Sequence, residues 1–567
     1  MWLRSAVEAD GSAGVIAEFV TTSADAQANA ERKRRRLAFD DAGIVRMRAA
    51  GYRAVKDRVL KAAGVATSDR LNDYPALPLM HVRVGDGAVL ARLLAHAELA
   101  ALHPNERKYL TLDSVSANMV GQAATQSLGL TGAGVTIAVI DSGADYTHPD
   151  LGSCSAPGVP AACKVAYWAN LADSGSVLDS SPNRHGTNVS AIVAGVAPGA
   201  RIAALNVFGS SSSTTDSTIL AAINWAISNQ AAYNIRAINL SLGNGISNTT
   251  PCSFGNPYTS AINSARNAGI LTVASSGNEG FTSGLANPAC TPNAVSVGAV
   301  YSQDWGSVSA AVCTDATTTA DKVPCFSNSA SFLTMLAPGA FITAGGAQMG
   351  GTSQGAAFVS GAIAVARAAY PSDTLAQTVS RLTSQAVLVT DPRNGITKPR
   401  LQLYSAVRPV NDDFANRLAL SGVSGSSSGT STYGTKEASE PNHAGNSGGR
   451  SVWWKWVAPS AGQVSLNTHG SGFDTLLAVY TGTSVAALTA VASNNHDGTA
   501  NGASGLLYQA QVGAEYQIAV DGDGGASGAL ALAWALNASA SANLSASLTA
   551  APNPAVVGAV LTYTVNM

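Results

Sequence analysis

The feature that most constrains the fold of this chain is a series of short apolar runs that alternate with helical stretches. Each run is apolar at nearly every position, which is typical of strands covered on both faces and therefore of a parallel sheet. Helices between such strands complete a doubly wound arrangement. We therefore predict an α/β fold with a doubly wound, mostly parallel sheet. The runs cover residues 135–140, 201–207, 237–242, 270–274 and 294–300, and the helix candidates between them cover 216–230 and 258–267.

Three polar residues adjoin these elements in the chain order Asp, His, Ser. Asp141 ends the first apolar run in Val-Ile-Asp-Ser-Gly, His185 lies in Arg-His-Gly-Thr, and Ser353 lies in Gly-Thr-Ser-Gln-Gly. A serine hydroxyl attacks a carbonyl when an imidazole base is within reach and a buried carboxylate holds that base in the right tautomer. Ser353 also opens a predicted helix of small residues, whose dipole favours negative charge near its start. The three residue types predict a serine peptidase.

Each of these residues also has a simpler interpretation. Asp141 can cap a buried strand, His185 is one of eight histidines, and Ser353 sits among small residues that favour tight helix packing. Their order, together with Asn278 between His185 and Ser353, favours the catalytic interpretation. Asn278 and Asp141 each follow a predicted strand, and the carboxyl ends of parallel strands share one sheet edge.

The segment 351–355 also matches the Gly-x-Ser-x-Gly nucleophile elbow of α/β-hydrolases. In that fold the acidic residue and the histidine follow the serine in the chain. In this chain Asp141 and His185 precede Ser353, so the elbow interpretation is rejected. The histidines after Ser353 lie in a region of different composition: His443, His469 and His496.

At these motifs the chain resembles the subtilisin-like (subtilase, peptidase S8 type) family of serine endopeptidases. The segment 274–280, Ala-Ser-Ser-Gly-Asn-Glu-Gly, is similar to the family segment whose asparagine completes the oxyanion hole. The resemblance implies a catalytic role for Asp141, His185 and Ser353 and an oxyanion-hole role for Asn278. It also implies substrate binding by Ser241, Leu242, Gly243, Ala274, Ser275, Ser276 and Gly277. Because the segment 274–277 consists of small residues, we predict a broad, mostly apolar preference for the substrate residue before the cut.

The chain departs from the family pattern around these motifs. At residues 187–189 it has Thr-Asn-Val, with Asn188 in place of the family's His, and it lacks the family's calcium-binding insertion, although Asp150 matches one ligand of that site. Near the nucleophile, Gln354, Ala357 and Phe358 replace the family's Met, Pro and His. We expect that the chemistry needs no cofactor, we assign no metal ligand, and we leave structural Ca²⁺ open.

Composition places the chain among large extracellular proteins. A chain of 567 residues is too long to fold around one hydrophobic core, so several domains are expected. The net charge of −2 disfavours nucleic acid as a partner. An even number of cysteines, without Cys-x-x-Cys spacing, favours disulfides over zinc and an oxidising compartment. Neighbour pairing, one of fifteen possible connectivities, predicts Cys154–Cys163, Cys252–Cys290 and Cys313–Cys325.

Localisation is inferred from the cysteines and the family resemblance. The first residues contain no apolar core of a signal peptide, and the natural start is expected to be missing. No run approaches 18 consecutive apolar residues, so no membrane span is expected. We therefore expect a secreted protein.

We expect four segments along the chain. Residues 1–112 resemble the small α/β propeptide of subtilases, an inhibitor that is cut off, here between about Tyr109 and Gly121. Residues 113–408 form the expected catalytic domain. Residues 411–535 resemble the accessory β-sandwich of pre-peptidase C-terminal type, and 544–567 the truncated start of a repeated extracellular β-module. The β-sandwich resemblance rests on the motifs at 451–456 (Ser-Val-Trp-Trp-Lys-Trp), 473–475 (Phe-Asp-Thr) and 479–482 (Val-Tyr-Thr-Gly).

Two further expectations concern the β-sandwich. Alternation along a strand puts Trp454 and Trp456 on one face and Trp453 on the other, so at least one face should be core, and the other is a candidate surface for a glycan or polymer. Seven oxygen-bearing residues could also gather at turns as Ca²⁺ ligands, although Asn and Asp favour turns without any metal. They are Glu437, Glu440, Asn442, Asp474, Asn494, Asn495 and Asp497.

Together these observations predict a secreted, monomeric serine endopeptidase, made as a zymogen, that acts on proteins or peptides and is inhibited by its own propeptide. Two alternatives stay open. One is a catalytically silent protein with the subtilase fold, which is disfavoured because no catalytic position is replaced. The other is that the β-sandwich is the working part, as a binding module for glycan or protein.

Overall fold

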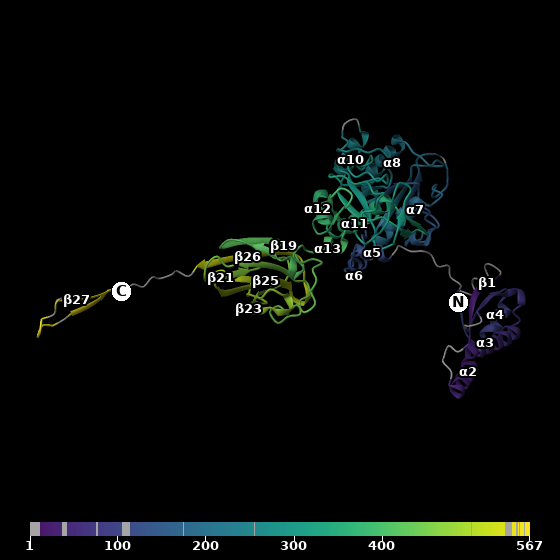
Figure 1. Cartoon of the computed structure of the whole chain (residues 1–567), viewed down its shortest axis with the longest axis horizontal. Helices are drawn as coiled ribbons and strands as arrows, with labels where there is room; N and C mark the ends of the chain where they lie inside the picture. The colour runs from purple at the N-terminus through teal and green to yellow at the C-terminus, as the bar shows by residue number, and fades with distance from the viewer. Residues whose placement is uncertain are drawn as a thin grey trace. The chain divides into compact units, whose positions relative to one another are not determined.

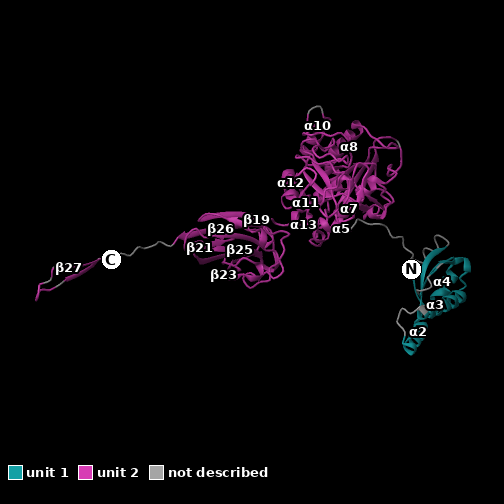
Figure 2. Ribbon diagram, viewed as in Figure 1, with its two compact units in different colours: residues 1–109 teal, residues 110–567 magenta. Residues whose placement is uncertain are grey.

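The computed structural model divides into two compact units, residues 1–109 and 110–567 (Figure 2). Among its described residues, no helix is both long enough and apolar enough to cross a bilayer. Residues 109–113 of the expected propeptide cleavage segment and residues 544–546 of the expected terminal β-module lie outside the described residues. The structure describes residues 12–36, 42–74, 78–104, 114–173, 175–253, 256–499, 502–538, 547–551, 554, 556–560 and 562–566.

The first unit is an antiparallel sheet with helices packed on it. The strand order is β2-β3-β1-β4. β1 buries every second side chain, Val15, Ala17 and Phe19, because successive side chains of a strand point to opposite faces. The elements are β1 (Ala13–Phe19), α2 (Thr22–Arg35), α3 (Ala42–Ala63), η1 (Thr67–Asp69), β2 (Arg70–Tyr74), β3 (Leu79–Val84), α4 (Gly87–Leu94) and β4 (Leu99–Pro104).

The second unit begins with two short helices and a nine-stranded sheet of order β16-β17-β13-β10-β9-β8-β5-β7-β6. Neighbouring strands are parallel throughout, except that β16 is antiparallel to β17 at the edge. Its strands are β5 (Thr136–Asp141), β6 (Val165–Asn170), β7 (Arg201–Asn206), β8 (Ile235–Leu240), β9 (Leu271–Ser275), β10 (Val295–Val300), β13 (Met335–Pro338), β16 (Val387–Thr390) and β17 (Thr397–Arg400).

Helices cover both faces of this sheet (Figure 1). One face carries α7 and α11, and the other carries α8 and α10, so the predicted doubly wound α/β fold is confirmed. Gly361 lets α7 and α11 approach closely, because a Cβ there would overlap the side chain of Val196. The helices are α5 (Ser114–Met119), α6 (Gln122–Ser127), α7 (His185–Val196), α8 (Asp216–Ser228), α9 (Gln230–Tyr233), α10 (Pro257–Asn267), α11 (Thr352–Ala369), α12 (Leu375–Ser384) and α13 (Leu403–Val407).

The loops of this region carry three disulfides and several short elements. The disulfides are the neighbour pairs Cys154–Cys163, Cys252–Cys290 and Cys313–Cys325, which close segments separated by 9, 38 and 12 positions. Cross-links of this kind restrict the unfolded chain more than the folded one and so stabilise the fold. The short elements are η2 (Pro149–Leu151), β11 (Val308–Ser309), β12 (Thr314–Asp315), β14 (Ile342–Ala344) and β15 (Ala347–Met349).

Residues 414–538 form two further sheets. Their orders are β18-β20-β25-β22-β23 and β19-β26-β21-β24, and apolar side chains of both pack into one core. A separate two-stranded sheet pairs β27 with β28. The elements are η3 (Phe414–Asn416), β18 (Leu418–Leu420), β19 (Ser424–Thr430), β20 (Val452–Val457), β21 (Gly462–Asn467), β22 (Thr475–Thr481), η4 (Val485–Ala487), β23 (Thr489–Asn494), β24 (Gly505–Ala510), β25 (Glu515–Gly522), η5 (Asp523–Gly525), β26 (Ala529–Ala538), β27 (Ser547–Ala551) and β28 (Thr562–Asn566).

The expectation that one face of the tryptophan strand is open to a ligand is wrong. Trp454 and Trp456 lie in the core between the two sheets, as alternation predicts. Trp453 points to the other face but is also fully buried, because Phe414 and Tyr480 cover it. The ring centroids of Phe414 and Trp453 lie 5.1 Å apart at 84°. The strand is therefore core on both faces.

The seven expected calcium ligands are mostly engaged with local partners. Glu440 Oε1 contacts His443 Nε2 at 2.8 Å in a fully buried pair, and Asp497 Oδ2 contacts His469 Nε2 at 2.6 Å. Asn495 donates to Asp523. Within the described ranges no group of three or more His, Cys, Asp or Glu is placed to hold a metal ion. Calcium binding by this part of the chain stays a prediction.

Candidate active site

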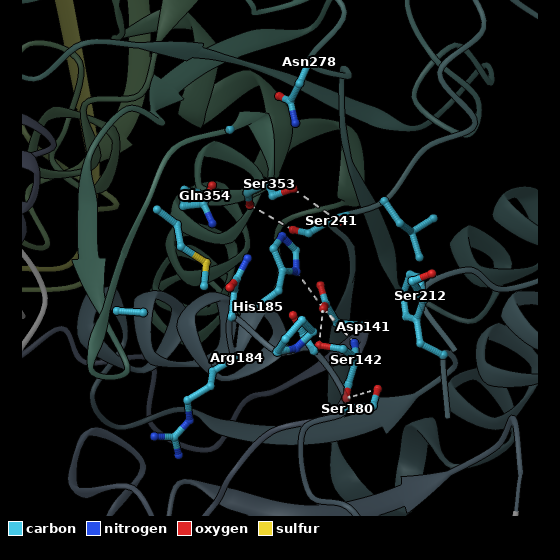
Figure 3. Close-up of a pocket in the computed structure, with 18 of the residues that line it drawn as sticks. Asp141, Ser142, Ser180, Arg184, His185, Ser212, Ser241, Asn278, Ser353 and Gln354 are labelled. Atoms are coloured by element: carbon cyan, nitrogen blue, oxygen red, sulfur yellow. Dashed lines mark hydrogen bonds and ion pairs between the residues drawn. The ribbon is translucent and has the colours of Figure 1, made fainter. Parts of the chain in front are cut away.

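The predicted catalytic side chains gather at the edge of the nine-stranded sheet where the strand order reverses. β5 lies between β7 and β8, so the chain builds the sheet first on one side of β5 and then on the other. Such a switch point leaves a crevice beyond the carboxyl ends of the strands. Asp141 ends β5, Ser241 follows β8 and Asn278 comes soon after β9. With His185 of α7 and Ser353 of α11 they line one pocket of about 1240 Å³ (Figure 3).

Asp141 and His185 form a hydrogen-bonded carboxylate–imidazole pair. His185 Nδ1 lies 2.8 Å from Asp141 Oδ1. Because an ionised carboxylate only accepts hydrogen bonds, Nδ1 carries the proton and Nε2 is left as a free base. The side chain of Asp141 is 2% exposed and that of His185 is 30% exposed, so the base is open to the pocket. Gly186 allows the start of α7 to lie close to the turn after β5, since a Cβ at this position would overlap the backbone of Gly143.

A second carboxylate, that of the half-buried Asp179, lies behind this pair. Asp179 Oδ1 is 2.7 Å from Ser142 Oγ, and that hydroxyl also lies 3.2 Å from Asp141 Oδ1. One hydroxyl proton serves only one of the two carboxylates, and the shorter distance favours Asp179. Ser142 then accepts from Gly186 N at 3.0 Å, while its own backbone N–H donates to Asp141 at 2.7 Å. Ser142 therefore links both carboxylates to the first turn of α7.

The two carboxylates set the electrostatics of the imidazole. Burial lowers the pKa of His185, but the charge of Asp141 and its hydrogen bond raise it by more, and the charge of Asp179 acts in the same direction. The pKa of His185 therefore lies above its ordinary value. The pKa of Asp179 is also raised, because the effect of burial exceeds that of the hydrogen bonds from Thr187 and Ser142, which lower it.

Ser353 is held at the start of α11 by the backbone that follows β8. Its hydroxyl donates to the carbonyl oxygen of Ser241 at 3.3 Å, and Ser241 Oγ donates back to the carbonyl oxygen of Ser353 at 2.9 Å. Asn239 Nδ2 donates to Ser241 Oγ at 2.9 Å and fixes that hydroxyl in turn. Catalytic hydrogen bonds are often longer or differently directed in the absence of substrate. Ser353 Oγ needs only a rotation about its Cα–Cβ bond to leave the carbonyl of Ser241.

Asn278 presents its amide nitrogen to the pocket. Its Oδ1 accepts from Thr352 N at 2.9 Å and from Thr352 Oγ1 at 3.1 Å. These bonds fix the amide orientation, so that the NH₂ group points toward Ser353 (Figure 3). Thr352 also accepts from Gly277 N at 3.1 Å. The residue before the predicted nucleophile therefore holds the predicted oxyanion donor.

The predicted substrate-binding residues divide into two sets. Ser241, Leu242 and Gly243 line the crevice with the predicted catalytic residues. The other four residues, Ala274, Ser275, Ser276 and Gly277, are buried beside it and are not among the residues that line it. Their role as a pocket wall stays a prediction.

Two departures from the family pattern contact each other. Gln354 Nε2 donates to Asn188 Oδ1 at 3.0 Å, and Asn188 Nδ2 donates to the carbonyl oxygens of Ala344 and Ala347. The pair ties α11 to α7 through fully buried hydrogen bonds. Asp150, the position that matches a family calcium ligand, accepts from Gly345 N at 2.8 Å. No metal-ligating cluster includes it among the described residues.

Sequence reasoning missed Ser142, Asp179 and Thr352. Ser142 follows Asp141 and Thr352 precedes Ser353, so both adjoin a predicted catalytic residue. The local sequence does not indicate where their side chains point. Asp179 lies in the loop before His185 and becomes a neighbour of Asp141 only when that loop folds back onto the turn after β5. The isolated bridge between Gly143 and Asp179 records this contact.

The sequence comparisons with known proteins agree on one family. Residues 132–412 match the model of the Subtilase family. A subtilisin of Bacillus pumilus is 33% identical over 280 residues, which cover 46% of this chain and 87% of the relative. Subtilisin E of Bacillus subtilis is also 33% identical, but this chain spans only 63% of its length. A cold-adapted subtilisin-like serine proteinase of known structure is 25% identical, with a TM-score of 0.38 and coverage of 48% of this chain and 89% of that one.

Proposed function

The chain belongs to the subtilase family of serine endopeptidases, and we propose that it cleaves peptide bonds through an acyl-enzyme formed on Ser353. The observation that carries this proposal is the hydrogen bond of 2.8 Å between His185 and Asp141, at the crevice that Ser353 and Asn278 also line. A free imidazole nitrogen, a hydroxyl and an amide donor at one crevice are the groups that acyl transfer requires.

In the proposed mechanism Ser353 Oγ attacks the scissile carbonyl carbon and gives its proton to His185 Nε2. Asp141 holds the imidazole and stabilises its positive charge. The negative carbonyl oxygen is stabilised by the Asn278 amide and the backbone N–H of Ser353. Collapse of the tetrahedral intermediate breaks the C–N bond, and the imidazolium protonates the leaving amine. Water then adds to the acyl-enzyme with His185 as the base, and Ser353 is regenerated.

Labelling with a fluorophosphonate tests the nucleophile directly. We expect one phosphonylated peptide that contains Ser353, together with hydrolysis of denatured casein by the same preparation. Labelling at another serine, or casein hydrolysis without loss of activity after labelling, would contradict the assignment.

The proposed preference for the substrate residue before the scissile bond is broad and mostly apolar. A strict requirement for an acidic or a basic residue there, in a peptide library, would contradict it.

Removing the amide of Asn278 is expected to slow turnover by about 10²–10³-fold, because one preorganised oxyanion donor is lost. The variant is Asn278→Ala, with kcat measured on a peptide p-nitroanilide. KM is expected to change little, since the charge develops only in the transition state. A matched control is Asn244→Ala, an amide that does not line the crevice. Equal turnover of the Asn278 variant and wild type would rule out the oxyanion role.

Asp179→Asn is expected to move the acid limb of the pH profile to lower pH. His185 acts as a base only when neutral, so kcat/KM falls as pH drops through its raised pKa. The charge of Asp179 contributes to that raised pKa. Its removal therefore lowers the pKa and extends activity toward acid. The measurement is kcat/KM against pH, beside Asp373→Asn, which removes a carboxylate that does not line the crevice. An unmoved acid limb would contradict this coupling.

We also propose that residues 1–112 are a propeptide that inhibits the enzyme until it is cut off, which makes the chain a zymogen. The compact first unit and its small α/β sheet support this proposal. The proposed cut lies between Tyr109 and Gly121 and is made by the enzyme itself. A chain with Ser353→Ala should then stay full length on prolonged incubation, whereas wild type should yield a shortened product. Normal processing of that variant when purified alone would exclude self-cleavage.

Secretion and a monomeric state are part of the same proposal. Three disulfides support an oxidising compartment. The proposed partners are protein or peptide substrates and the propeptide. The alternative of a silent protein or a β-sandwich binding module is not favoured, because the family match covers the proposed catalytic residues and Trp453, Trp454 and Trp456 are all buried.

A further inference from the structure

The proposed oxyanion donor lies on an irregular segment of the chain. After β9 ends, residues 276–280 belong to neither a helix nor a strand. Asn278 is exposed in this segment, whereas Gly277 before it is buried. A group that stabilises a transition state must be held to within about 0.5 Å, and a loop reaches that precision only with support from its neighbours. Thr352 fixes the Asn278 amide and accepts from Gly277 N, which leaves the chain after Asn278 to be held by another residue.

The side chain of Asn328 contacts this segment on both sides of Asn278. Its Nδ2 donates to the carbonyl oxygen of Ser276 at 3.0 Å and to Glu279 Oε2 at 2.6 Å. Its Oδ1 accepts from Glu279 N at 3.2 Å and from Phe281 N at 2.9 Å. One amide therefore bridges the chain that enters the turn at Asn278 and the chain that leaves it.

The hydrogen-bonding capacity of the Asn328 side chain is fully used. An asparagine amide has two donor hydrogens and an oxygen that accepts two bonds, and all four are engaged in a side chain that is completely buried. The backbone N–H of Asn328 also donates to the carbonyl oxygen of Gly277 at 3.0 Å. A Cβ at Gly277 would lie 2.3 Å from Asn328 Nδ2, so this close approach requires glycine. The segment is thus fitted around one amide.

The loop that carries Asn328 is itself held from outside the segment. The disulfide Cys313–Cys325 closes the loop that precedes it. Arg393 lies in the turn between β16 and β17 and donates to the carbonyl oxygens of Cys325 and Ser327, each at 2.7 Å. Because a cross-link and a guanidinium group both fix this loop, Asn328 is a rigid support for the segment at Asn278.

We propose that Asn328 is a positioning residue for the oxyanion donor, because its side chain fixes the turn that presents Asn278 to the scissile carbonyl. This inference rests on the proposed endopeptidase function. Asn328 is not among the residues that line the crevice, so it acts on the reaction through the segment it holds. A displacement of about 1 Å in a reacting group can lower a rate by about 10²-fold. We therefore expect loss of the Asn328 amide to lower kcat and to change KM little, since the oxyanion charge develops only in the transition state.

A double-mutant cycle separates positioning from a general structural role. The variants are Asn328→Ala, Asn278→Ala and the two together, with kcat measured on a peptide p-nitroanilide. Asn328→Ala should lower kcat by about 10²-fold in the wild-type chain. In the chain that already lacks the Asn278 amide it should cost less than about 3-fold, because the donor it positions is gone. Equal factors in both chains, or no loss in the wild-type chain, would overturn the proposal.

Asn170→Ala is a matched control in the same domain. Asn170 Oδ1 accepts from Ala172 N and Asp173 N, and its Nδ2 donates to Asp173 Oδ1 and to the carbonyl oxygen of Gly175. This amide makes the same four kinds of hydrogen bond in another turn, and it does not line the crevice. Its removal should leave kcat at the wild-type value. A loss equal to that of Asn328→Ala would show that any such turn is needed and would overturn the proposal.

Asn328→Asp gives a second test that keeps the size of the side chain, should the alanine variant fail to fold. It retains an acceptor for Glu279 N and Phe281 N but turns a carboxylate toward the Glu279 carboxylate, which repels it. We expect kcat to fall, and Glu279→Gln in the same chain should recover it several-fold by removing the second charge and supplying a donor. Wild-type kcat for Asn328→Asp, or no recovery with Glu279→Gln, would overturn the proposal.

The same measurements separate this inference from the proposed function. If wild type does not cleave the p-nitroanilide, the endopeptidase proposal fails. If Asn278→Ala cleaves it as fast as wild type, the oxyanion role fails, and the inference drawn from it fails too. If Asn278→Ala is slow while Asn328→Ala is as fast as wild type, only the positioning role of Asn328 is refuted.

Discussion

Replacement of Ser353 by alanine is expected to lower turnover by about 10⁶-fold, as loss of the nucleophile does in subtilisin. The reason is that Ser353 Oγ is the proposed nucleophile, so without it the oxyanion donors and substrate binding alone remain. The measurement is kcat on a peptide p-nitroanilide, with active-site titration to exclude traces of wild type. Activity within tenfold of wild type would refute the assigned nucleophile.

Folding of this variant should be nearly unchanged. Ser353 Oγ makes a hydrogen bond of 3.3 Å to Ser241, and the loss of one such bond costs about 1 kcal/mol. Ser190→Ala provides a matched control, because Ser190 is fully buried in α7 and its hydroxyl has no hydrogen-bond partner among the described residues. That control should keep full activity. Similar losses in both variants would indicate damage to the fold instead of to the chemistry.

Asp141→Asn is expected to lower turnover by about 10⁴-fold. Asparagine removes the negative charge and can donate to Nδ1, which moves the imidazole proton to Nε2 and blocks the base. The pKa of His185 should fall as well, because the charge of Asp141 is the main influence that raises it. The His185 pKa is measured by the chemical shift of its ring protons during titration, beside kcat on a p-nitroanilide. Asp373→Asn again serves as the control.

Two outcomes distinguish the orienting role of Asp141 from a structural one. If Asp141 orients and charges the base, turnover collapses and the His185 pKa falls while the thermal midpoint stays close to that of wild type. If the residue only caps β5, stability falls and turnover per folded molecule stays high. A variant with full activity and a lowered His185 pKa would refute the orienting role while leaving the electrostatic coupling intact.

The strands and the order of the motifs could be predicted because they depend on local properties of the chain. Residues 135–140 are apolar at every position except Thr136, since both faces of β5 are covered by helices, and the structure places β5 at Thr136–Asp141. The start of α11 was similarly readable from the small residues after Ser353. In each case the burial that shapes the element acts on consecutive residues, so it leaves a periodic pattern.

Contacts between loops leave no such pattern. Ser142, Asp179 and Thr352 each act on a predicted catalytic residue, yet only the folded chain shows which neighbour their side chains reach. The burial of Trp453 was missed for the same reason: alternation correctly placed it opposite Trp454, but the cover on that face comes from Phe414 and Tyr480, which are distant in the sequence.

The amino-acid sequence by itself determined the α/β fold class and the order of the proposed triad residues, since each of these depends on short segments of consecutive residues. Only the tertiary structure decided how those segments are supported. It placed Asp179 behind Asp141, turned the Asn278 amide toward the crevice through Thr352, and set the disulfide-closed loop beside the oxyanion donor. Each of these depends on distances between residues far apart in the chain, which are set by how loops pack at the sheet edge.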